Sequence, residues 1–262
     1  MEPPSAPGAA VSGPLWLISG SALADLQATA GVAFVRQYLG SARTTVLVGR
    51  RIPPQYESWP VHFAYDFRSV SQLQAALSQG LAPGVSELLY DPEHWPYTPL
   101  AEQVDVPAAA GRAALLAEHA GLGLIVAPAT DLAEVLEPGR PVAPAFLSSG
   151  VLPGVSAAAD AVEIQAQGME SDPALYAAYV REAAAQIRSA NPRVELFSGL
   201  STNPSGKAVT VGELLRAVSL TRDVVSGYWL NIPSGGAACP RCGKAQPQVA
   251  VSLLRDLAGG AG

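Results

Sequence analysis

The feature that most constrains the fold is a regular alternation of short β-rich runs with longer helical patterns. Such alternation is typical of parallel α/β architecture, in which each helix returns the chain to the start of the next strand. The expected strands are Leu15–Ser19, Thr44–Val48, His62–Asp66, Glu87–Asp91, Leu124–Ala127, Ala161–Gln165, Val194–Ser198 and Val224–Leu230. About eight strands in 262 residues predict a single (β/α)₈ barrel of the TIM type. A doubly wound open sheet is the main rival, but no G-x-G-x-x-G turn follows the first strand.

Helical patterns lie between most of the expected strands. The expected helices are Ala22–Leu39, Val70–Gln79, Ala108–Ala120, Pro173–Ala190, Thr210–Leu220 and Pro247–Leu257. The fourth of these has a favourable start, with Asp172 as N-cap and Pro173 in the first turn. Arg50–Val61 is short for a crossover helix, so a loop or a single turn is expected in this second βα unit. The Pro- and Gly-rich stretch Asp131–Ala159 is expected to hold a short helix, a rim excursion and a further helix near Ala145–Ala159.

Composition limits the partners and the surroundings of the chain. Hydrophobic residues make up 49% and charged residues 15%, which indicates a large buried core. The net charge of −6 and the lack of a basic run argue against nucleic acid and membranes as partners, and we expect a monomer. Residues 1–13 are interpreted as a flexible N-terminal arm before a barrel domain at 14–262. The arm does not resemble a signal peptide, so the expected location is cytoplasmic; the alternative is a secreted protein whose signal has been removed.

The run Glu87–Trp95 is the most informative for function. Asp91 ends the fourth expected strand, Pro92 stops strand pairing, and Glu93 is the first residue of the rim. Two carboxylates one residue apart can both face the mouth of a barrel, where their repulsion raises one pKa and lets one group act as an acid. Asp91 and Glu93 are therefore the candidate catalytic residues. The alternative is that both form salt bridges or cap the segment Tyr97–Glu102.

The sixth expected strand carries a polar face. Period-two alternation places Val162 and Ile164 toward the helices, and Glu163, Gln165 and Gln167 toward the inside of the barrel. Buried polar groups must be hydrogen-bonded, so this set either forms an internal network or contacts a polar ligand. Gln165 and Gln167 are candidate substrate-binding residues, whereas Glu163 lies deeper and is expected to be structural.

Other polar and aromatic residues come at or near expected strand ends, where the sites of such barrels lie. The remaining substrate-binding candidates are Asp66, Trp95, Ser198, Asn203, Trp229 and Asn231. Trp59 also falls near a strand end. Indole faces at a polar mouth can stack on sugar rings, although a core position is the alternative for each single tryptophan. Arg50 or Arg51 could pair with a carboxylate or hold a substrate anion, and the alternative for each is a solvated surface position.

No cofactor and no metal site are predicted. The G-x-S-x-G and Walker patterns are absent, and neither lysine follows an expected strand. Asp66, Asp91, Glu93 and His94 could together hold a metal ion, but no H-x-H or H-E-x-x-H spacing supports such a site. The C-P-R-C motif at residues 239–242 offers too few ligands for structural zinc. It is interpreted as a local disulfide or as two free thiols in a Gly-rich loop.

The D-x-E pattern of Asp91 and Glu93, together with Trp229 on the eighth expected strand, resembles the chitinase-type family 18 glycoside hydrolases, which are (β/α)₈ barrels. The resemblance implies that Glu93 is the general acid, Asp91 its partner and Trp229 the floor of a sugar subsite. The fuller family motif, D-x-x-D-x-D-x-E, has Asp where this chain has Ser86 and Leu89, and glutamines stand in place of the tyrosine on its sixth strand. The chain as a whole also resembles actinobacterial proteins of Ala- and Arg-rich composition, which implies no particular activity.

Three hypotheses about function stay open. The first is a glycoside hydrolase-like enzyme that uses Asp91 and Glu93 for general acid–base chemistry on a carbohydrate substrate. The second is a cofactor-free lyase, isomerase or cyclase acting on a small metabolite, which predicts a closed and mostly apolar pocket. The third is a non-catalytic ligand-binding barrel, which predicts that both carboxylates are tied up in salt bridges with no cavity beside them.

Overall fold

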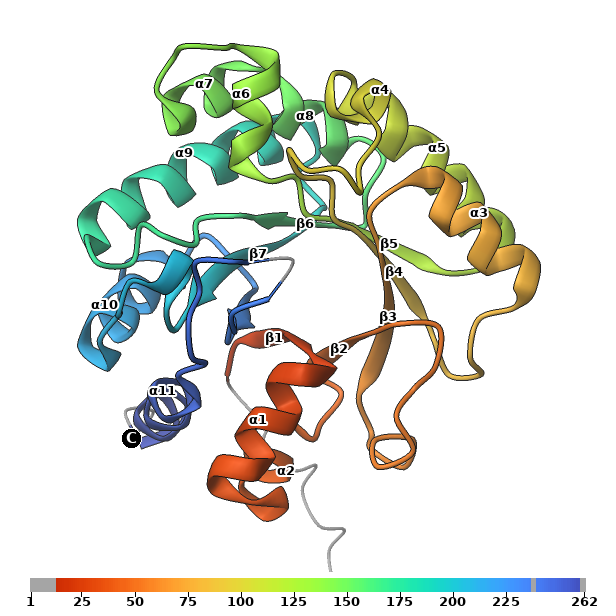
Figure 1. Cartoon of the computed structure of the whole chain (residues 1–262). Coiled ribbons are helices and arrows are strands. Elements are labelled where there is room, and N and C mark those ends of the chain that lie inside the picture. The colour runs from red at the N-terminus through yellow and green to blue at the C-terminus, as the bar shows by residue number, and fades with distance from the viewer. Residues whose placement is uncertain (1–12, 237–238, 260–262) are drawn as a thin grey trace, which may run out of the picture.

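The computed structural model describes residues 13–236 and 239–259, and its centre is a closed barrel of parallel strands (Figure 1). The strands follow one another around the barrel in chain order, and the last pairs with the first. They are β1 (Leu15–Ser19), β2 (Thr44–Val48), β3 (His62–Phe67), β4 (Glu87–Tyr90), β5 (Gly123–Val126), β6 (Ala161–Ile164), β7 (Glu195–Ser201) and β8 (Gly227–Asn231). The predicted (β/α)₈ fold is confirmed. The expected arm at 1–13 lies, except for Gly13, outside the described residues.

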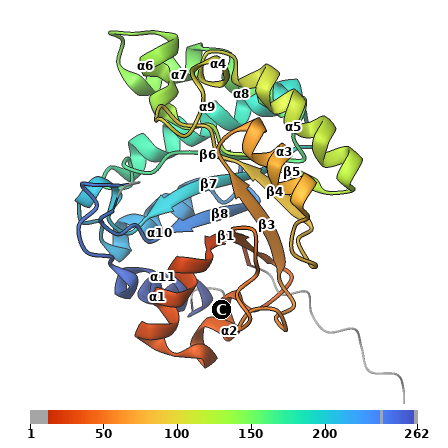
Figure 2. The same cartoon turned by 45° about the vertical axis from the view of Figure 1, so that its right-hand side comes forward.

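Helices surround the barrel on its outer side, which Figures 1 and 2 show from two directions. The α-helices are α1 (Gly20–Ala30), α2 (Val32–Leu39), α3 (Val70–Gln79), α4 (Leu100–Gln103), α5 (Val106–Ala120), α6 (Ala133–Leu136), α7 (Val142–Ser148), α8 (Val151–Ser156), α9 (Pro173–Ala190), α10 (Val211–Thr221) and α11 (Pro247–Gly259). Two 3₁₀ turns, η1 (Thr130–Leu132) and η2 (Pro204–Gly206), complete the set. None of the described helices is long and apolar enough to cross a membrane.

Two parts of the helical layer differ in how well they were predicted. The expected helix Ala22–Leu39 is wrong as a single element, because the chain breaks at Gly31 between α1 and α2. Gly31 has φ 86°, a backbone conformation that glycine adopts without strain and that an α-helix cannot contain. The segment between β2 and β3 contains no helix, in agreement with the loop or turn expected there.

Successive side chains of each strand point to opposite sides of the barrel wall, so the molecule has an inner and an outer apolar layer. The inner layer fills the barrel with Leu17, Leu47, Ala64, Leu89, Ile125, Ala127, Ala161 and Phe197. The outward side chains, including Val162 and Ile164 on β6, pack against the helices in a second and larger core. Because apolar side chains fill the lower barrel, the polar side chains that face inward at the upper strand ends surround the open mouth. His62 lies at the opposite end, as predicted, beside a separate cavity of about 160 Å³.

Candidate active site

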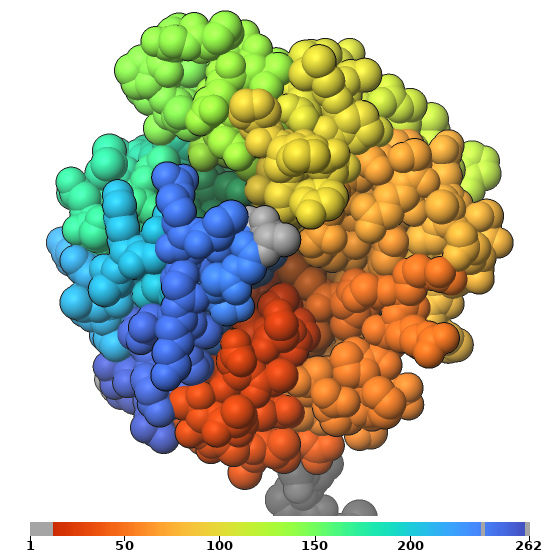
Figure 3. Space-filling model, in the orientation of Figure 1, coloured from red at the N-terminus to blue at the C-terminus, as the bar shows by residue number. Residues whose placement is uncertain are grey.

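A cavity of about 520 Å³ opens at the carboxyl ends of the strands. Figure 3 shows this face hollowed where segments from the two ends and the middle of the chain meet. The cavity is lined by Ser19, Ser21, Leu47, Asp66, Arg68, Asp91, Glu93, Trp95, Thr130, Gln165, Gln167, Trp229, Asn231, Ile232, Pro233, Ser234, Gly235, Gly236 and Cys239. Every predicted site residue except Ser198 and Asn203 is in this set, so strand order brings together residues that are far apart in the sequence.

Asp91 lies at the centre of the site, directly after β4. Its side chain is nearly buried, and Gln165 donates a hydrogen bond from Nε2 to Asp91 Oδ1 at 2.9 Å. The same nitrogen of Gln165 lies 3.0 Å from the carbonyl oxygen of Ala127, which fixes the amide between β5 and β6. Burial raises the pKa of Asp91 well above its ordinary value, and the charges of Glu93 and Asp66 raise it further. Burial and the neighbouring carboxylates therefore favour the protonated form of Asp91.

Glu93 is the carboxyl group of the pair that changes protonation near neutral pH. Burial raises the pKa of Glu93 to about 7, and the charge of Asp131 adds to this, whereas Arg68 and a hydrogen bond with Asp91 lower it. The backbone nitrogen of Glu93 donates to Thr98 Oγ1 at 3.3 Å. Neither Asp91 nor Glu93 takes part in a salt bridge within the described part of the chain.

The alternative capping role for this pair is not observed either. The short helix in the segment Tyr97–Glu102 is α4, and its N-cap is Pro99, with no side chain bonded to its first turn. Both carboxyl groups therefore stay available to the cavity.

Arg68 is the cation among the described residues that line the cavity, and it was not predicted as a site residue. Its Nη2 lies 3.0 Å from Asp66 Oδ2, and its guanidinium carbon lies 5.6 Å from the centroid of the Trp95 indole. Trp95 is fixed in turn by a hydrogen bond from Nε1 to Thr98 Oγ1 at 3.0 Å. Arg68 lowers the pKa values of Asp66, Asp91 and Glu93 against the effect of burial. It follows Asp66 by two residues, and this period-two spacing was a sequence indication that it belongs to the site.

Glu163 lies one layer below the site and faces the inside of the barrel, as the alternation on β6 predicted. It is fully buried, and neither of its carboxyl oxygens has a hydrogen-bond partner within the described residues. Burial raises the pKa of Glu163 well above its ordinary value, and the charge of Glu93 contributes to the shift. Glu163 thus belongs to the same electrostatic cluster as Asp91 and Glu93.

The side chain of Gln167 lies against Gly199, a residue within β7. A Cβ atom on Gly199 would come within 2.1 Å of Gln167 Cδ, so the bare backbone of this glycine makes room for the amide. Trp229 and Asn231 on β8 line the same cavity. The site therefore combines carboxyl groups on one side with amides and an indole on the other.

Two predicted site residues do not line the cavity. Ser198 faces outward, where its Oγ lies 2.7 Å from the phenol oxygen of Tyr176 in α9. β7 continues to Ser201, three residues beyond the expected end, so Ser198 is not at the rim. Asn203 is buried, and its amide nitrogen contacts backbone carbonyl groups of the loop after β8, 2.9 Å away in the case of Cys242.

Two further candidates lie outside the site. Trp59 is buried in the loop between β2 and β3, where its ring centroid lies 5.2 Å from that of Tyr56. His94, considered as a metal ligand, has its Nδ1 3.4 Å from Glu134 Oε2 on α6. Among the residues that the structure describes, no three His, Cys, Asp or Glu side chains are arranged to hold a metal ion. Arg51 lines a hollow that adjoins the cavity at Asp66 and Arg68.

The fold and site define the chain as a (β/α)₈ barrel with a carboxyl-rich cavity at its C-terminal rim. No protein-family model matches the chain, and no curated protein matches it. Similar solved structures include a chitinase from Chromobacterium violaceum, with a TM-score of 0.53 and 12% identity over 93% of this chain and 99% of that chain. A triosephosphate isomerase from Bartonella henselae has a TM-score of 0.51 and 12% identity over 94% and 99% of the two chains.

A third similar structure is a β-1,3-glucanosyltransferase from Rhizomucor miehei, with a TM-score of 0.50 and 9% identity over 90% of this chain and 97% of that chain. The structural neighbours thus include a chitinase and another carbohydrate-active enzyme, which is consistent with the resemblance drawn from the D-x-E pattern. At these identities the likeness shows the shared barrel fold, and the chemistry has to be argued from the site itself.

Proposed function

We propose that this chain is a glycoside hydrolase-like enzyme in which Glu93 is the general acid and Asp91 orients it. The observation that carries the proposal is the pair itself: two carboxyl groups at a barrel mouth, free of salt bridges and facing a cavity of about 520 Å³. The pKa of Glu93, raised to about 7, suits proton transfer at neutral pH. The indoles of Trp95 and Trp229 in the cavity wall offer apolar faces for sugar rings.

In the proposed reaction Glu93 first gives up a proton and later takes one back. Protonated Glu93 donates its proton to the glycosidic oxygen as the bond between that oxygen and the sugar carbon breaks. The ionised Glu93 then takes a proton from the water molecule whose oxygen adds to the sugar carbon, which restores the starting state. Asp91 keeps its proton, donates it in a hydrogen bond to Glu93, and is fixed by the amide of Gln165.

The two other hypotheses receive less support. A lyase or isomerase site was expected to be closed and mostly apolar, whereas the cavity wall contains carboxyl, amide, hydroxyl and guanidinium groups. A non-catalytic barrel was expected to have its carboxylates tied up in salt bridges with no cavity beside them. The described residues show the opposite arrangement around Asp91 and Glu93.

A screen of chromogenic glycosides and of chitin and glucan oligomers tests the proposal. We expect Glu93→Gln, which keeps the shape but cannot exchange the proton, to lower kcat by about 10²- to 10⁴-fold on any substrate that the wild-type chain cleaves. Glu57→Gln, an exposed change in the loop between β2 and β3, is the matched control and should leave kcat unchanged. No cleavage and no sugar binding across the panel would reject the proposed function.

A further inference from the structure

A hollow of about 380 Å³ adjoins the candidate active site at the carboxyl ends of β1, β2 and β3. It is lined by Ser19, Gly20, Ser21, Leu47, Val48, Gly49, Arg51, Pro53, Asp66 and Arg68. Five of these residues also line the larger cavity, so the two spaces lie side by side. Arg51 belongs to the hollow and not to the cavity. The sequence left open whether Arg51 holds a substrate anion, and the proposed reaction does not use it.

The hollow has an excess of positive charge. Its ionisable side chains are those of Arg51, Arg68 and Asp66, and Asp66 forms a salt bridge with Arg68 at 3.0 Å. Arg51 is exposed and takes part in none of the salt bridges among the described residues. Even when Asp66 is ionised, the two guanidinium groups leave one positive charge without a counterion in the hollow.

The backbone of Arg51 is held in place by the chain on both sides of it. β2 ends at Val48, and Ile52, the residue directly after Arg51, is buried. Tyr56 and Trp59 in the same loop are also buried, and their rings pack edge to face at 5.2 Å. A fixed backbone keeps the guanidinium group within reach of the hollow, so less conformational freedom is lost when it binds a ligand.

Two hydroxyl groups of the hollow lie at the start of α1. Ser19 Oγ accepts a hydrogen bond from the backbone nitrogen of Ala22 at 3.1 Å and lies 2.9 Å from Ser21 Oγ. When Ser19 donates its proton to Ser21, the proton of the Ser21 hydroxyl is available to a ligand. Ser21 is therefore a neutral hydrogen-bond donor in the same hollow as the two guanidinium groups.

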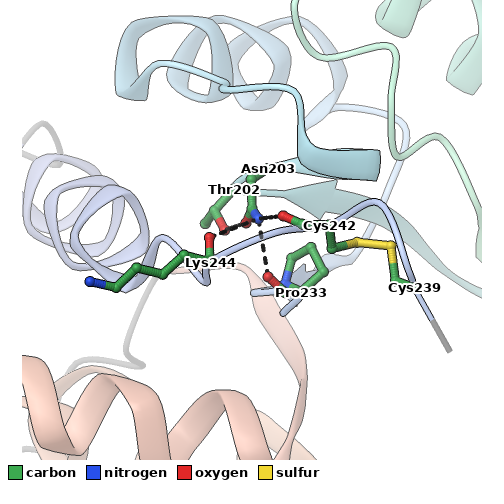
Figure 4. The surroundings of a disulfide bond; sticks show 6 residues. All are labelled: Thr202, Asn203, Pro233, Cys239, Cys242 and Lys244. Carbon is green, nitrogen blue, oxygen red and sulfur yellow. Dashed lines mark hydrogen bonds between the residues drawn. A yellow bond between two sulfur atoms is a disulfide. The ribbon is translucent and has the colours of Figure 1, made fainter. Parts of the chain in front are cut away.

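The rest of the cavity is less suited to an anion. The carboxyl group of Glu93 repels an anion when it is ionised, and the described cavity-lining residues of the loop after β8 include no charged side chain. Figure 4 shows part of this loop, in which Cys239 is joined to Cys242 in a disulfide. Of the two alternatives left open by the sequence, the structure thus contains the disulfide, which carries no charge. The hollow is therefore the best place for an anionic group.

We propose that this hollow binds an anionic group of the substrate, with Arg51 as the residue that recognises it. The inference rests on the proposed function and deepens it, because it names the substrate class: a glycoside whose sugar carries a carboxylate, sulfate or phosphate group. The planar guanidinium group of Arg51 can donate two parallel hydrogen bonds to any of these groups. Ser21 and Arg68 add a neutral donor and a second positive charge. The bond to be cleaved then lies at Glu93, and the anionic group lies apart from the carboxyl pair.

Binding of free sugars tests the inference without turnover. Glucuronate, glucose 6-sulfate and glucose 6-phosphate are compared with glucose, their neutral counterpart, in chemical-shift titrations of the full chain at neutral pH. We expect at least one anionic sugar to bind about tenfold more tightly than glucose, and salt at about 0.5 M to remove most of the difference. Inorganic sulfate or phosphate that binds as tightly as the corresponding sugar would overturn the inference, since the hollow would then bind a free anion.

Arg51→Gln and Arg50→Gln form a matched pair of variants. Both residues are exposed arginines of the same loop, and Arg50 does not line the hollow. We expect Arg51→Gln to weaken binding of the anionic sugar by about three- to thirtyfold and to leave glucose binding within about twofold. Arg50→Gln should change neither. Equal losses in the two variants would overturn the inference, because they would reflect the net charge of the chain and not the hollow.

Turnover supplies the second readout, on matched pairs of chromogenic glucosides and glucuronides. On any glucuronide that the chain cleaves, we expect Arg51→Gln to raise KM by about three- to thirtyfold and to leave kcat within about twofold, because Arg51 lies away from the reacting atoms. Arg51→Lys, which keeps the charge and loses the paired hydrogen bonds, should recover part of the loss. A fall in kcat with unchanged KM in Arg51→Gln would contradict a role in substrate recognition.

The outcomes separate this inference from the proposed function. If neither neutral nor anionic glycosides are cleaved, the proposed function fails, and the titrations still decide whether the hollow binds anionic sugars. If neutral glycosides are cleaved and no anionic sugar binds more tightly than glucose, the proposed function stands and this inference is overturned.

Discussion

At the scale of single residues, burial and one positive charge have opposite effects on the pKa values of the carboxyl groups at the barrel mouth. Burial raises the pKa values of Asp66, Asp91 and Glu93, and the guanidinium group of Arg68 lowers all three. Removing water favours the neutral form of a carboxyl group, whereas a nearby cation favours the charged form. Arg68 therefore lowers the pH at which Glu93 gives up its proton, although it need not contact the substrate.

This balance predicts a shift of the pH–rate profile in a variant of Arg68. In the proposed mechanism Glu93 must be protonated to act as an acid, so kcat/KM should decline as the pH rises through the pKa of Glu93, about 7. In Arg68→Gln the pKa of Glu93 rises, the protonated form persists to higher pH, and the declining limb moves upward by about half a unit to one unit. Arg68→Lys, which keeps the charge, should leave the limb near its original place. A downward shift in Arg68→Gln would contradict this account.

Site residues were predictable from the sequence where strand alternation alone decides their direction. Asp91 follows a short strand that ends at Tyr90, and Gln165 continues the polar face of β6, so the sequence correctly placed both at the cavity. Ser198 was misplaced because the end of β7 depends on pairing with β8 up to Asn231, which no local pattern contains. The direction of Asn203 was equally hidden, since its carbonyl partners lie some 30 to 41 residues further along the chain.

At the scale of helices and strands, a few buried polar residues join neighbouring elements to the site. Glu102 in α4 is the clearest example. Glu102 is 7% exposed, and its carboxyl oxygens accept hydrogen bonds from the backbone nitrogen of Val70 at 3.1 and 3.2 Å. The phenol of Tyr90 donates to the same carboxyl group at 2.7 Å. Glu102 thus binds the start of α3 and the end of β4 to the excursion that carries Glu93.

Glu102→Ala is predicted to destabilise the chain by about 2–4 kcal/mol. The change leaves a buried phenol and the first turn of α3 without their acceptor, and unsatisfied buried donors are costly. Chemical denaturation with urea, monitored by circular dichroism, measures the free energy of unfolding. Glu118→Ala, an exposed glutamate on α5, should cost less than about 0.5 kcal/mol. A loss of similar size in both variants would argue against the contact network described for Glu102.

Element boundaries were best predicted where a side chain defines the end. α3 and α9 have the expected bounds because Ser69 and Asp172 accept hydrogen bonds from the first turns. Gly31 was missed because one glycine in a long apolar pattern is compatible with a continuous helix. The short helices α6, α7 and α8 were foreseen only in outline, since their places depend on packing over the barrel and not on local caps.

Several carboxyl groups are buried at different places in the whole molecule. Burial raises the pKa values of Glu163 and Asp131 as well as those of Asp91 and Glu93, and it raises that of Glu170 to about 7. A carboxyl group whose pKa is higher in the folded chain binds its proton more tightly there than in the unfolded chain. The stabilisation that such a group contributes to the folded chain is therefore fully present below its pKa in the unfolded chain. It is lost as the pH rises through its pKa in the folded chain.

The raised pKa values predict that the chain is more stable in mild acid than in mild base. Between about pH 4.5 and 7 the folded chain retains protons that the unfolded chain has released, so the free energy of unfolding falls as the pH rises. We expect Tm at pH 5 to exceed Tm at pH 8 by several degrees, about 2–4 °C for each kcal/mol. Scanning calorimetry at constant ionic strength measures this, and Glu93→Gln should flatten the profile. A Tm that rises from pH 5 to pH 8 would contradict the assignment of raised pKa values.

The barrel as a whole was predictable because its repeating unit is local. Each strand and helix has its own pattern of apolar residues, and about eight such units suffice to indicate closure. Closure itself is a long-range event, because β1 and β8 pair through residues such as Leu15 and Gly227, more than 200 positions apart. No local pattern could have shown which loops would meet above the mouth.

The pairing of β8 with β1 also orders events during synthesis. Asp91 and Glu93 leave the ribosome early, but Trp229 and the loop that follows it come from the last part of the chain. A growing chain can form its first βα units while the barrel is still open, and its carboxyl groups then face water on one side. Only when the last strand has docked on the first does the cavity acquire its far wall. The cavity is therefore complete only after translation has passed Cys239, the last residue that lines its wall.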